Sequence, residues 1–378
     1  MGENKMKKVL SLVLALCMTA ALLAGCQGGG NSAEGGSMKV AMITDYGDIT
    51  DQSFNQSTYE ACKEYTGSKN LKFQYYKPTG NSTEARVASF NLAVADGYDT
   101  IVVPGYAFGE MIVEVAEKNP NVKIIALDVS SGDFPEGYTV PANVCTFTYQ
   151  EEIAGYMAGY AAVMEGYTKL GFLGGIAVPA VIRYGYGFVQ GANDAAAAKG
   201  NADAVEINYV YGGAFAGDPA ITAVMDTWYS GGTEVVFACG GGIFTSACEA
   251  AVKVDGKVIG VDVDQKATIE GMYSKEGLCV TSAMKGLAAT VKAVLADVEA
   301  GKWSDYSGKV SNLGLVSGDD PELNYVQLPT ATWTMKNFTV DNYKALVKDI
   351  FDGKIKVSAD TAAMPSVSIK VTTFDNIK

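Results

Sequence analysis

The stretch TIVVPGYAFGEMIVEVAEKNPNVKIIAL, residues 100–127, contains one complete repeat of the predicted fold. Short apolar runs at 100–103 and 123–127 are typical of buried strands. Residues 108–118 have the length and apolar spacing of a helix, and they follow a Pro-Gly turn. The stretch therefore predicts strand, helix and strand, the unit of a parallel sheet covered by helices.

The same alternation extends in both directions from this stretch. Further short apolar runs predict strands at 39–44, 71–76, 170–173, 204–209, 234–238 and 257–261. Segments of helical length lie at 52–65, 82–95, 151–164, 180–198, 219–229, 244–252 and 285–300. The pattern breaks near residues 144–149 and then restarts, which predicts an α/β fold with two similarly built lobes.

The chain is too long for a single ordinary core, so two lobes also agree with its length. We place the first lobe at about residues 38–145 together with part of 283–330. The second lobe takes about residues 146–282 and part of the C-terminal tail, whose pattern beyond residue 300 is less regular.

The N-terminus has the features of a secretory signal. Lys5, Lys7 and Lys8 precede an apolar run at 9–23, and Leu-Ala-Gly-Cys at 23–26 resembles a lipobox. We predict a signal peptide at 1–25, a lipid on the Cys26 thiol and a glycine-rich tether at 26–37. The alternative is an ordinary signal peptide in which Cys26 is incidental. No second long apolar run follows, which predicts attachment to the extracytoplasmic face of the cell membrane through the lipid alone.

Charge and composition exclude several functions. The chain has 29 basic and 42 acidic residues, a net charge of −13, and without residues 1–25 it would have 26 and 41, a net charge of −15. Nucleic acid is therefore not an expected partner, because binding its phosphates requires basic patches. The chain has no histidine, which excludes Ser-His-Asp and Cys-His enzymes.

Cysteine spacing argues against a zinc site. Seven cysteines occur without a C-x-x-C pair, and five remain after Cys17 leaves with the signal and Cys26 is acylated. Most of these five stand beside apolar residues, and we expect them to be small buried hydrophobes. Their spacing leaves open whether any of them pair. We predict no cofactor and no metal site.

Polar and aromatic residues follow several of the predicted strands. In open α/β sheets, ligands bind beyond the carboxyl ends of the strands. The residues found there are the carboxylates Asp45, Asp128 and Asp262, the aromatics Phe54, Tyr106 and Tyr184, and the amine of Lys285. Carboxylates accept protons from a vicinal diol, a lysine donates to the same oxygens, and aromatic faces stack on a flat ring. The mixture suits a neutral polyhydroxylated ligand with a flat ring.

Some of these residues have structural interpretations as well. Asp51 and Asp264 are placed to cap helices. Phe54 follows the helical spacing of a core stripe, so spacing alone leaves pocket and core equally open for it. The three glycines at 240–242 could cradle a phosphate, but they lack the spacing and the lysine of a P-loop, which favours a simple turn.

A series of motifs extends over about residues 38–300. They are Thr44-Asp45, DQSFNQ at 51–56, IVVPGY at 101–106, Asn119-Pro120, Leu127-Asp128, Glu151 with Gly155-Tyr156 and Gly159-Tyr160, GFLGG at 171–175, Pro179, Gly187-Phe188, Gly191-Ala192, GVDVDQ at 260–265 and TSAMK at 281–285. In this order they resemble the basic membrane protein family of lipoproteins, which includes purine nucleoside receptors of ABC importers. The resemblance implies a type I periplasmic-binding-protein fold with two Rossmann-like lobes, three crossovers and an ABC permease as the membrane partner.

The resemblance also implies a nucleoside in the cleft between the lobes. The base would stack between Phe54 and an aromatic residue of the second lobe, for which Tyr184 is the first choice and Phe188 the second. Asp262 and Lys285 would hold the ribose hydroxyls, and the remaining polar contacts would come from Asp45, Asn55 and Asp128.

The chain departs from the family pattern near the expected base site. Tyr106 and Tyr184 stand where phenylalanine is commoner, and Tyr46-Gly47-Asp48 is an unusual loop, so the preferred base is left open. Two other functions remain open as well. The first is a receptor of the same fold for a sugar. The second is a nucleoside-processing enzyme, for which Asp45, Asp48 and Asp51 would be a partial calcium cluster.

Overall fold

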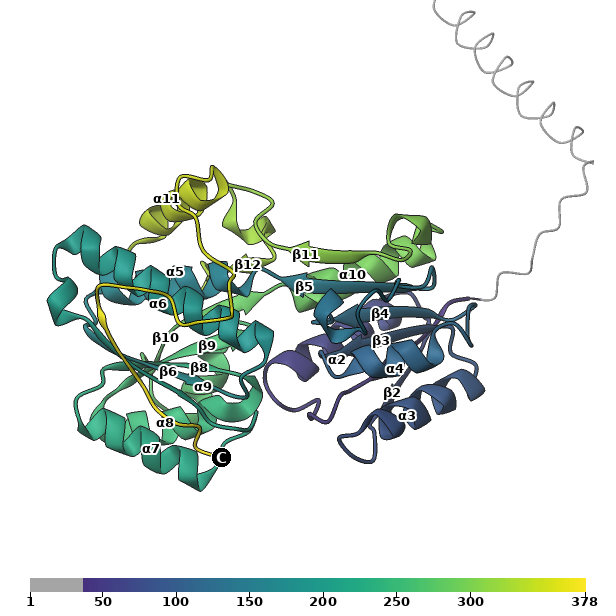
Figure 1. The fold of residues 1–378 in the computed structure, drawn as a ribbon, viewed down its shortest axis with the longest axis horizontal. Coiled ribbons are helices and arrows are strands. Elements are labelled where there is room, and N and C mark those ends of the chain that lie inside the picture. Colours follow the sequence, from purple (N-terminus) through teal and green to yellow (C-terminus); the bar gives the residue numbers. More distant parts are fainter. Residues whose placement is uncertain (1–36) are drawn as a thin grey trace, which may run out of the picture. The chain divides into compact units, whose positions relative to one another are not determined.

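The computed structural model describes residues 37–378. The predicted signal peptide, Cys26 and the tether up to residue 36 lie outside the described residues. The described chain forms two sheets with helices packed on them, and each sheet belongs to one lobe (Figure 1). The predicted α/β fold with two lobes is confirmed.

The sheet of the first lobe has six strands. In spatial order they are β11 (Val310–Leu313), β5 (Val144–Tyr149), β4 (Lys123–Leu127), β3 (Thr100–Pro104), β1 (Lys39–Ile43) and β2 (Lys72–Tyr76). All neighbouring pairs are parallel. The helices of this lobe are α2 (Phe54–Ser68), α3 (Thr83–Ala95), α4 (Phe108–Val115) and α10 (Leu287–Glu299).

The sheet of the second lobe has seven strands. In spatial order they are β12 (Val326–Gln327), β10 (Cys279–Lys285), β9 (Lys257–Asp262), β8 (Val235–Cys239), β6 (Lys169–Gly174), β7 (Glu206–Tyr211) and β13 (Lys370–Thr373). All pairs are parallel except β10 with β12. The helices are α5 (Glu151–Glu165), α6 (Pro179–Lys199), α7 (Pro219–Ser230), α8 (Phe244–Val254), α9 (Lys266–Tyr273) and α11 (Val340–Phe351).

Within the described residues the chain passes between the two sheets three times. The passages lie between β5 and β6, between β10 and β11, and between β11 and β12. The lobe boundaries placed at 145/146 and 282/283 fall inside β5 and β10. Strand pairing extends β5 to Tyr149 in the first sheet and β10 to Lys285 in the second. The first two passages therefore begin directly after Tyr149 and Lys285.

Alternate residues of the central strands pack on opposite faces of each sheet, as the strand period of two requires. In β1, Val40 and Met42 join one buried cluster, whereas Ala41 and Ile43 join another on the opposite face. Because both faces are covered by helices, the strands read as continuous apolar runs rather than as alternating ones. The stretch quoted first supplies β3, α4 and β4 in this way.

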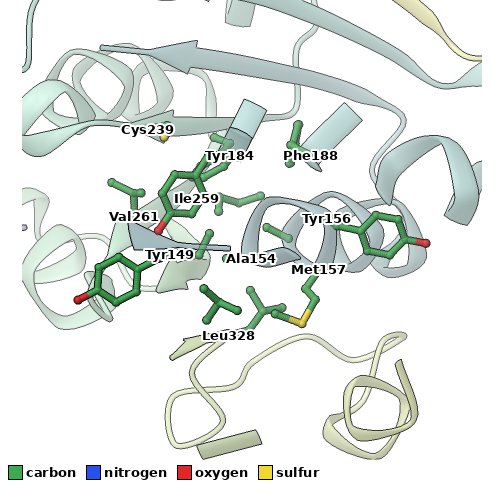
Figure 2. Packing of buried hydrophobic residues seen from close by; sticks show 14 of the residues in the cluster. Tyr149, Ala154, Tyr156, Met157, Tyr184, Phe188, Cys239, Ile259, Val261 and Leu328 are labelled. Carbon is green, nitrogen blue, oxygen red and sulfur yellow. The ribbon is translucent and has the colours of Figure 1, made fainter. Parts of the chain in front are cut away.

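Helices α5 and α6 pack unusually closely, and glycines make this approach sterically feasible. Gly155 and Gly159 in α5 lie against the carbonyl oxygens of Tyr184 and Phe188, and α6 places Gly191 against the carbonyl oxygen of Tyr156. A Cβ at any of these glycines would collide with the facing backbone. Figure 2 shows the side chains buried around this pair of helices. The contact fixes the first turns of α5 and α6 relative to one another.

Among residues 37–378, we find no helix that combines the length and the apolar character needed to cross a membrane. The five cysteines of this part of the chain are all buried and unpaired, as small hydrophobic residues would be.

Candidate functional site

A cavity of about 690 Å³ is lined by residues of both lobes, at the carboxyl ends of their strands. This volume lies in the range of sites that enclose a small organic ligand. The structure brings eight of the nine predicted ligand-binding residues to its wall. They are Asp45, Phe54, Asn55, Tyr106, Asp128, Tyr184, Asp262 and Lys285.

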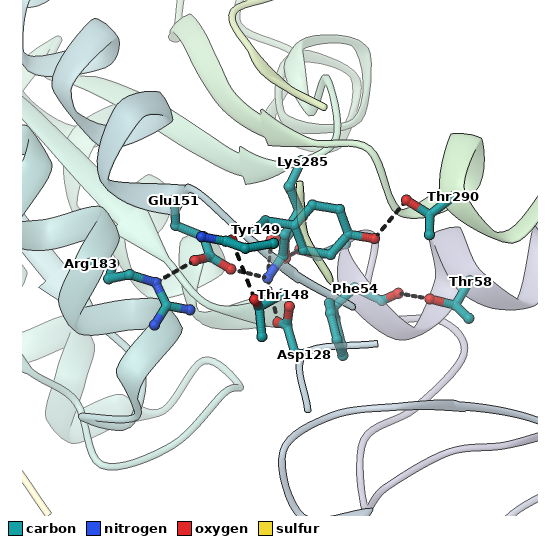
Figure 3. A network of polar contacts seen from close by, with 12 residues as sticks. Phe54, Thr58, Asp128, Thr148, Tyr149, Glu151, Arg183, Lys285 and Thr290 are labelled. Atoms are coloured by element: carbon teal, nitrogen blue, oxygen red, sulfur yellow. Dashed lines mark hydrogen bonds and ion pairs between the residues drawn. The ribbon is translucent and has the colours of Figure 1, made fainter. Parts of the chain in front are cut away.

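Lys285 is the centre of a buried ion-pair network in this cavity (Figure 3). Its Nζ lies 2.5 Å from Asp128 Oδ2, 3.4 Å from Glu151 Oε1 and 3.8 Å from Asp262 Oδ1. The Lys285 side chain is 3% exposed. Burial alone would lower the pKa of Lys285, but the three surrounding carboxylates hold it above its ordinary value. The ammonium therefore stays charged and points its donors at the cavity wall.

Glu151 extends this network to Arg183. The Arg183 Nε donates to Glu151 Oε2 over 2.7 Å, and the Glu151 side chain is fully buried. Glu151 is the first residue of α5, and Arg183 lies in the first turns of α6. The close packing of α5 on α6 places the two side chains together. Glu151 and Arg183 were not among the predicted site residues. An acidic residue at a helix start, such as Glu151, is usually explained by the helix dipole.

Asp128 and Asp262 share an uncommon backbone conformation. Their φ angles are 55° and 65°, in the left-handed region. Few non-glycine residues adopt it, and a residue held in it depends on support from the surrounding structure. Asp128 follows β4 in the first lobe, and Asp262 ends β9 in the second. The two carboxylates therefore reach Lys285 from opposite lobes.

Burial changes the acidity of these carboxylates. Burial raises the pKa of Asp128 to about 6, although the Lys285 ammonium opposes the shift. Burial also raises the pKa of Asp262, again against the effect of Lys285. Oδ1 of Asp128 is buried without a hydrogen-bond partner, so one acceptor of this carboxylate is unused in the described structure.

The wall of the first lobe also presents Asp45 and Asn55. Oδ1 of Asp45 accepts from the backbone N–H groups of Tyr46 and Gly47, at 2.6 and 2.7 Å. Burial raises the pKa of Asp45 despite these bonds. Asn55 donates its amide to Asp51 over 3.2 Å, and its Oδ1 is buried without a partner. Asn55 thus has one unused acceptor oxygen in the wall of the first lobe.

Asp51 and Asp264 have structural roles, as predicted. Asp51 accepts from the backbone N–H groups of Ser53, Asn55 and Gln56, at 2.9 to 3.0 Å, and so caps the first turn of α2. Asp264 accepts from the backbone of Lys266 and from the hydroxyl of Thr332, at 3.2 and 2.6 Å. Asp264 does not line the cavity.

The aromatic residues divide into lining and core positions. The Phe54 ring lies in the wall, with its centroid 4.9 Å from Lys285 Nζ. Tyr184 also lines the cavity, but it is only 1% exposed and its ring edge packs on Phe237. Tyr106 and Tyr46 line the wall of the first lobe.

The second choice for the stacking residue, Phe188, has to be corrected. Phe188 is fully buried, with its ring beside those of Phe172 and Phe237, and it does not line the cavity. It lies one helical turn beyond Tyr184, about 6 Å further along α6 from the cleft. Sequence analysis missed Phe215, a partly buried residue of the loop after β7 that does line the cavity. Its ring packs on Gly175 and Gly240, where a side chain would collide with it.

The turn at residues 240–242 lines the same cavity. Gly240 and Gly241 have φ angles of 141° and 51°, conformations that glycine adopts without strain. Within residues 37–378, no group of three or more His, Cys, Asp or Glu side chains is arranged to hold a metal ion.

Two α/β lobes with a ligand-sized cavity at their facing strand ends have the architecture of the two-lobed periplasmic-binding-protein fold. Solved structures agree with this fold. An ABC transporter system solute-binding protein from Aeropyrum pernix K1 superposes with a TM-score of 0.64 at 21% sequence identity, over 84% of this chain and 87% of that one. At this identity the likeness concerns the fold, which is that of the type I periplasmic-binding proteins.

The sequence comparisons identify the family. The family model described as "ABC transporter substrate-binding protein PnrA-like" matches residues 38–319, and the chain belongs to this Bmp family. A protein of Lactococcus lactis subsp. cremoris, named ABC transporter nucleoside-binding protein BmpA, is 28% identical over 93% of this chain and 99% of its own length. Basic membrane protein A1 of Borrelia garinii subsp. bavariensis is 30% identical over 74% of this chain and 77% of its own length.

Membership of this family settles the general function. The chain is a solute-binding protein of the ABC transporter type and not an enzyme. The predicted resemblance to the basic membrane protein family is confirmed.

Proposed function

We propose that this protein binds a purine nucleoside between its lobes and delivers it to an ABC permease, from a lipid anchor at Cys26 on the extracytoplasmic face. The observation that carries the proposal is Lys285 held between Asp128 and Asp262, beside the ring of Phe54. The name of the Lactococcus relative, a nucleoside-binding protein, supports the ligand class. The signal motif at residues 1–26 supports the anchor.

The network suits a ribose diol. A carboxylate accepts protons from two neighbouring hydroxyls, and an ammonium donates to the same oxygens. Lys285 has three N–H donors. Its third and longest contact is the 3.8 Å approach of Nζ to Asp262 Oδ1, and a ribose oxygen would replace this contact. The unpartnered Oδ1 of Asp128 offers an acceptor from the first lobe.

The base would lie against the Phe54 ring. From the second lobe, Tyr184 and Phe215 both line the cavity, and Phe215 presents the more accessible ring. On the wall of the first lobe, Asp45 and Asn55 offer acceptors for N–H groups of the base. A ligand with polar edges and a flat face fits this arrangement better than a free sugar does.

The charges around the cavity disfavour a nucleotide. Asp128, Glu151 and Asp262 are paired with Lys285 and Arg183, and Arg86 is the cation near Asp45, so these four carboxylates outnumber their nearby cations. A phosphate would add negative charge to a buried group of carboxylates, which costs Coulomb energy at low dielectric. We therefore expect nucleosides to bind and their monophosphates to bind much more weakly.

A thermal-shift panel tests this function. The full-length protein is heated with adenosine, guanosine, inosine, cytidine, their 5′-monophosphates, ribose and galactose. The proposal predicts a rise in Tm with purine nucleosides, because a ligand that binds only the folded state stabilises it. A rise with a free sugar and none with any nucleoside would favour the sugar receptor that sequence analysis left open.

Removal of the Phe54 ring is expected to weaken nucleoside binding by about 1–3 kcal/mol, the range for stacking on one base. Titration calorimetry of Phe54→Ala measures this loss. The control is Tyr59→Ala, which removes another ring of α2 that packs on Phe73 and Tyr75 away from the cavity. Unchanged affinity in a folded Phe54→Ala variant would assign Phe54 to the core.

Nucleoside affinity is expected to fall as pH is lowered below about 6. The pKa of Asp128 is raised to about 6, so its carboxylate takes up a proton in this range and loses both its acceptor charge and its ion pair with Lys285. If only the ionised form binds, the Kd rises about tenfold between pH 7 and pH 5, one pH unit either side of that pKa.

The same proton has the opposite effect on the stability of the free protein. Because the folded pKa of Asp128 exceeds the ordinary value of 3.8, the folded state binds more protons than the unfolded state between pH 6 and pH 4. This group therefore favours folding as pH falls.

Titration calorimetry from pH 5 to pH 8 measures how the nucleoside affinity depends on pH. Asp128→Asn should flatten this profile. Glu152→Gln is the control, because burial raises the pKa of Glu152 to about 7 and this group also titrates in the range. A profile flattened by Glu152→Gln alone would contradict the assignment to Asp128.

A further inference from the structure

Two consecutive residues of the first lobe form hydrogen bonds with the second lobe. The Ser53 hydroxyl donates to Asp262 Oδ2 over 2.6 Å, and Gln265 Nε2 donates to the backbone oxygen of Gln52 over 3.0 Å. Ser53 is 1% exposed and Gln265 is fully buried. Water therefore does not compete for these bonds while the lobes are together.

Ser53 occupies the N-cap position of α2, but its side chain does not cap the helix. Asp51 already accepts from the first-turn N–H groups of Asn55 and Gln56. The Ser53 hydroxyl therefore does not have the N-capping role that usually explains a serine at this position. It is instead directed across the cleft at a carboxylate of the candidate site.

Gln265 is held in place on its own lobe before it reaches the first. Its Oε1 accepts from the backbone N–H of Val261 over 2.9 Å, and its backbone N–H donates to Ser282 Oγ over 3.1 Å. Its amide nitrogen therefore points at the first lobe at little further cost in side-chain entropy. The acceptor residue, Gln52, has a φ of 57°, a left-handed conformation that turns the loop at this contact.

We propose that Ser53 and Gln265 are positioning residues that form an interlobe latch. Both bonds involve protein atoms alone, and both break when the lobes separate, so they stabilise only the closed arrangement. Ser53 also holds Oδ2 of Asp262, which leaves Oδ1 for the ligand and Lys285. The hydrogen bond that orients Asp262 therefore forms only when the lobes close. The ligand part of this inference rests on the proposed nucleoside function, whereas the closure part does not.

The test compares Ser53→Ala with Ser53→Thr, which keeps a hydroxyl, and with Ser57→Ala. Ser57 is a half-buried serine in the next turn of α2 whose side chain makes no interlobe hydrogen bond in the described structure. Small-angle X-ray scattering of the full-length protein without added ligand reports lobe separation. Stopped-flow release of guanosine reports the lifetime of the closed complex.

The latch predicts a larger radius of gyration for Ser53→Ala than for the wild type. It also predicts guanosine release about tenfold faster, as loss of one hydrogen bond to a charged group implies. Ser53→Thr should retain more of the wild-type behaviour, and Ser57→Ala all of it. Scattering curves of Ser53→Ala and Ser57→Ala that coincide would overturn the latch. If the wild type binds no nucleoside, the proposed function fails, and the scattering comparison still decides the latch.

Discussion

Replacement of Lys285 by methionine is expected to abolish nucleoside binding and to lower the free energy of unfolding by about 3–5 kcal/mol, the cost of removing one partner from a buried ion pair. Lys285 is the shared counter-ion of Asp128, Glu151 and Asp262, whose side chains are at most 12% exposed. Without it, the carboxylates repel one another in a low-dielectric site or must take up protons. Among residues 37–378, no other lysine lines the cavity.

The matched control for this variant is Lys292→Met. Lys292 lies on α10, and its side chain is 43% exposed and paired with Glu64 on the surface. Surface pairs contribute little, so this variant should keep nearly wild-type stability and affinity. Urea unfolding gives the stabilities and calorimetry the affinities. If a folded Lys285→Met protein bound the nucleoside with wild-type affinity, the assignment of Lys285 as a ligand-binding residue would be wrong.

Asp262→Ala is expected to weaken nucleoside binding by about two orders of magnitude, because it removes a charged acceptor for ligand hydroxyls and one end of the Ser53 bond. Asp264→Ala is expected to change affinity little. Asp264 lies two residues further along and bonds Lys266 and Thr332 outside the cavity.

Comparing Asp262→Ala with Asp264→Ala distinguishes the loss of a ligand contact from the loss of one negative charge in this segment. Both variants remove one carboxylate from the same loop, so they change the net charge equally. Calorimetric titration with guanosine measures each Kd, and thermal unfolding without ligand shows whether each variant is folded. Equal losses of affinity in the two variants would contradict the assignment of Asp262 to the ribose.

The local pattern of the sequence was enough to predict the alternating fold. The central strands β1, β3, β4, β8 and β9 are short apolar runs, because burial on both faces excludes polar residues from their interiors. The positions of Asp45, Asp128, Asp262 and Lys285 followed from the same pattern. Parallel strands place their carboxyl ends at one edge, so residues just after them converge even when they are far apart in the sequence.

Contacts that depend on the docking of helices and lobes could not be predicted in this way. Glu151 and Arg183 meet because glycines let α5 and α6 pack closely, and the choice between Tyr184 and Phe188 depends on how far α6 extends from the cleft. Ser53 has the sequence signature of a helix cap, and only the approach of Asp262 shows its other partner. The edge strands β11 and β13 join their sheets through long-range pairing, which short-range patterns do not encode.

A purine nucleoside held in the cleft of this protein can be detected directly. The most direct measurement is native mass spectrometry of the protein purified from its own cells without added ligand, followed by release and identification of the bound molecule. We expect the wild-type protein to carry an adduct with the mass of a purine nucleoside, and we expect Lys285→Met to lack it. Release of a free sugar or a nucleotide, or a nucleoside adduct that persists in Lys285→Met, would contradict this expectation.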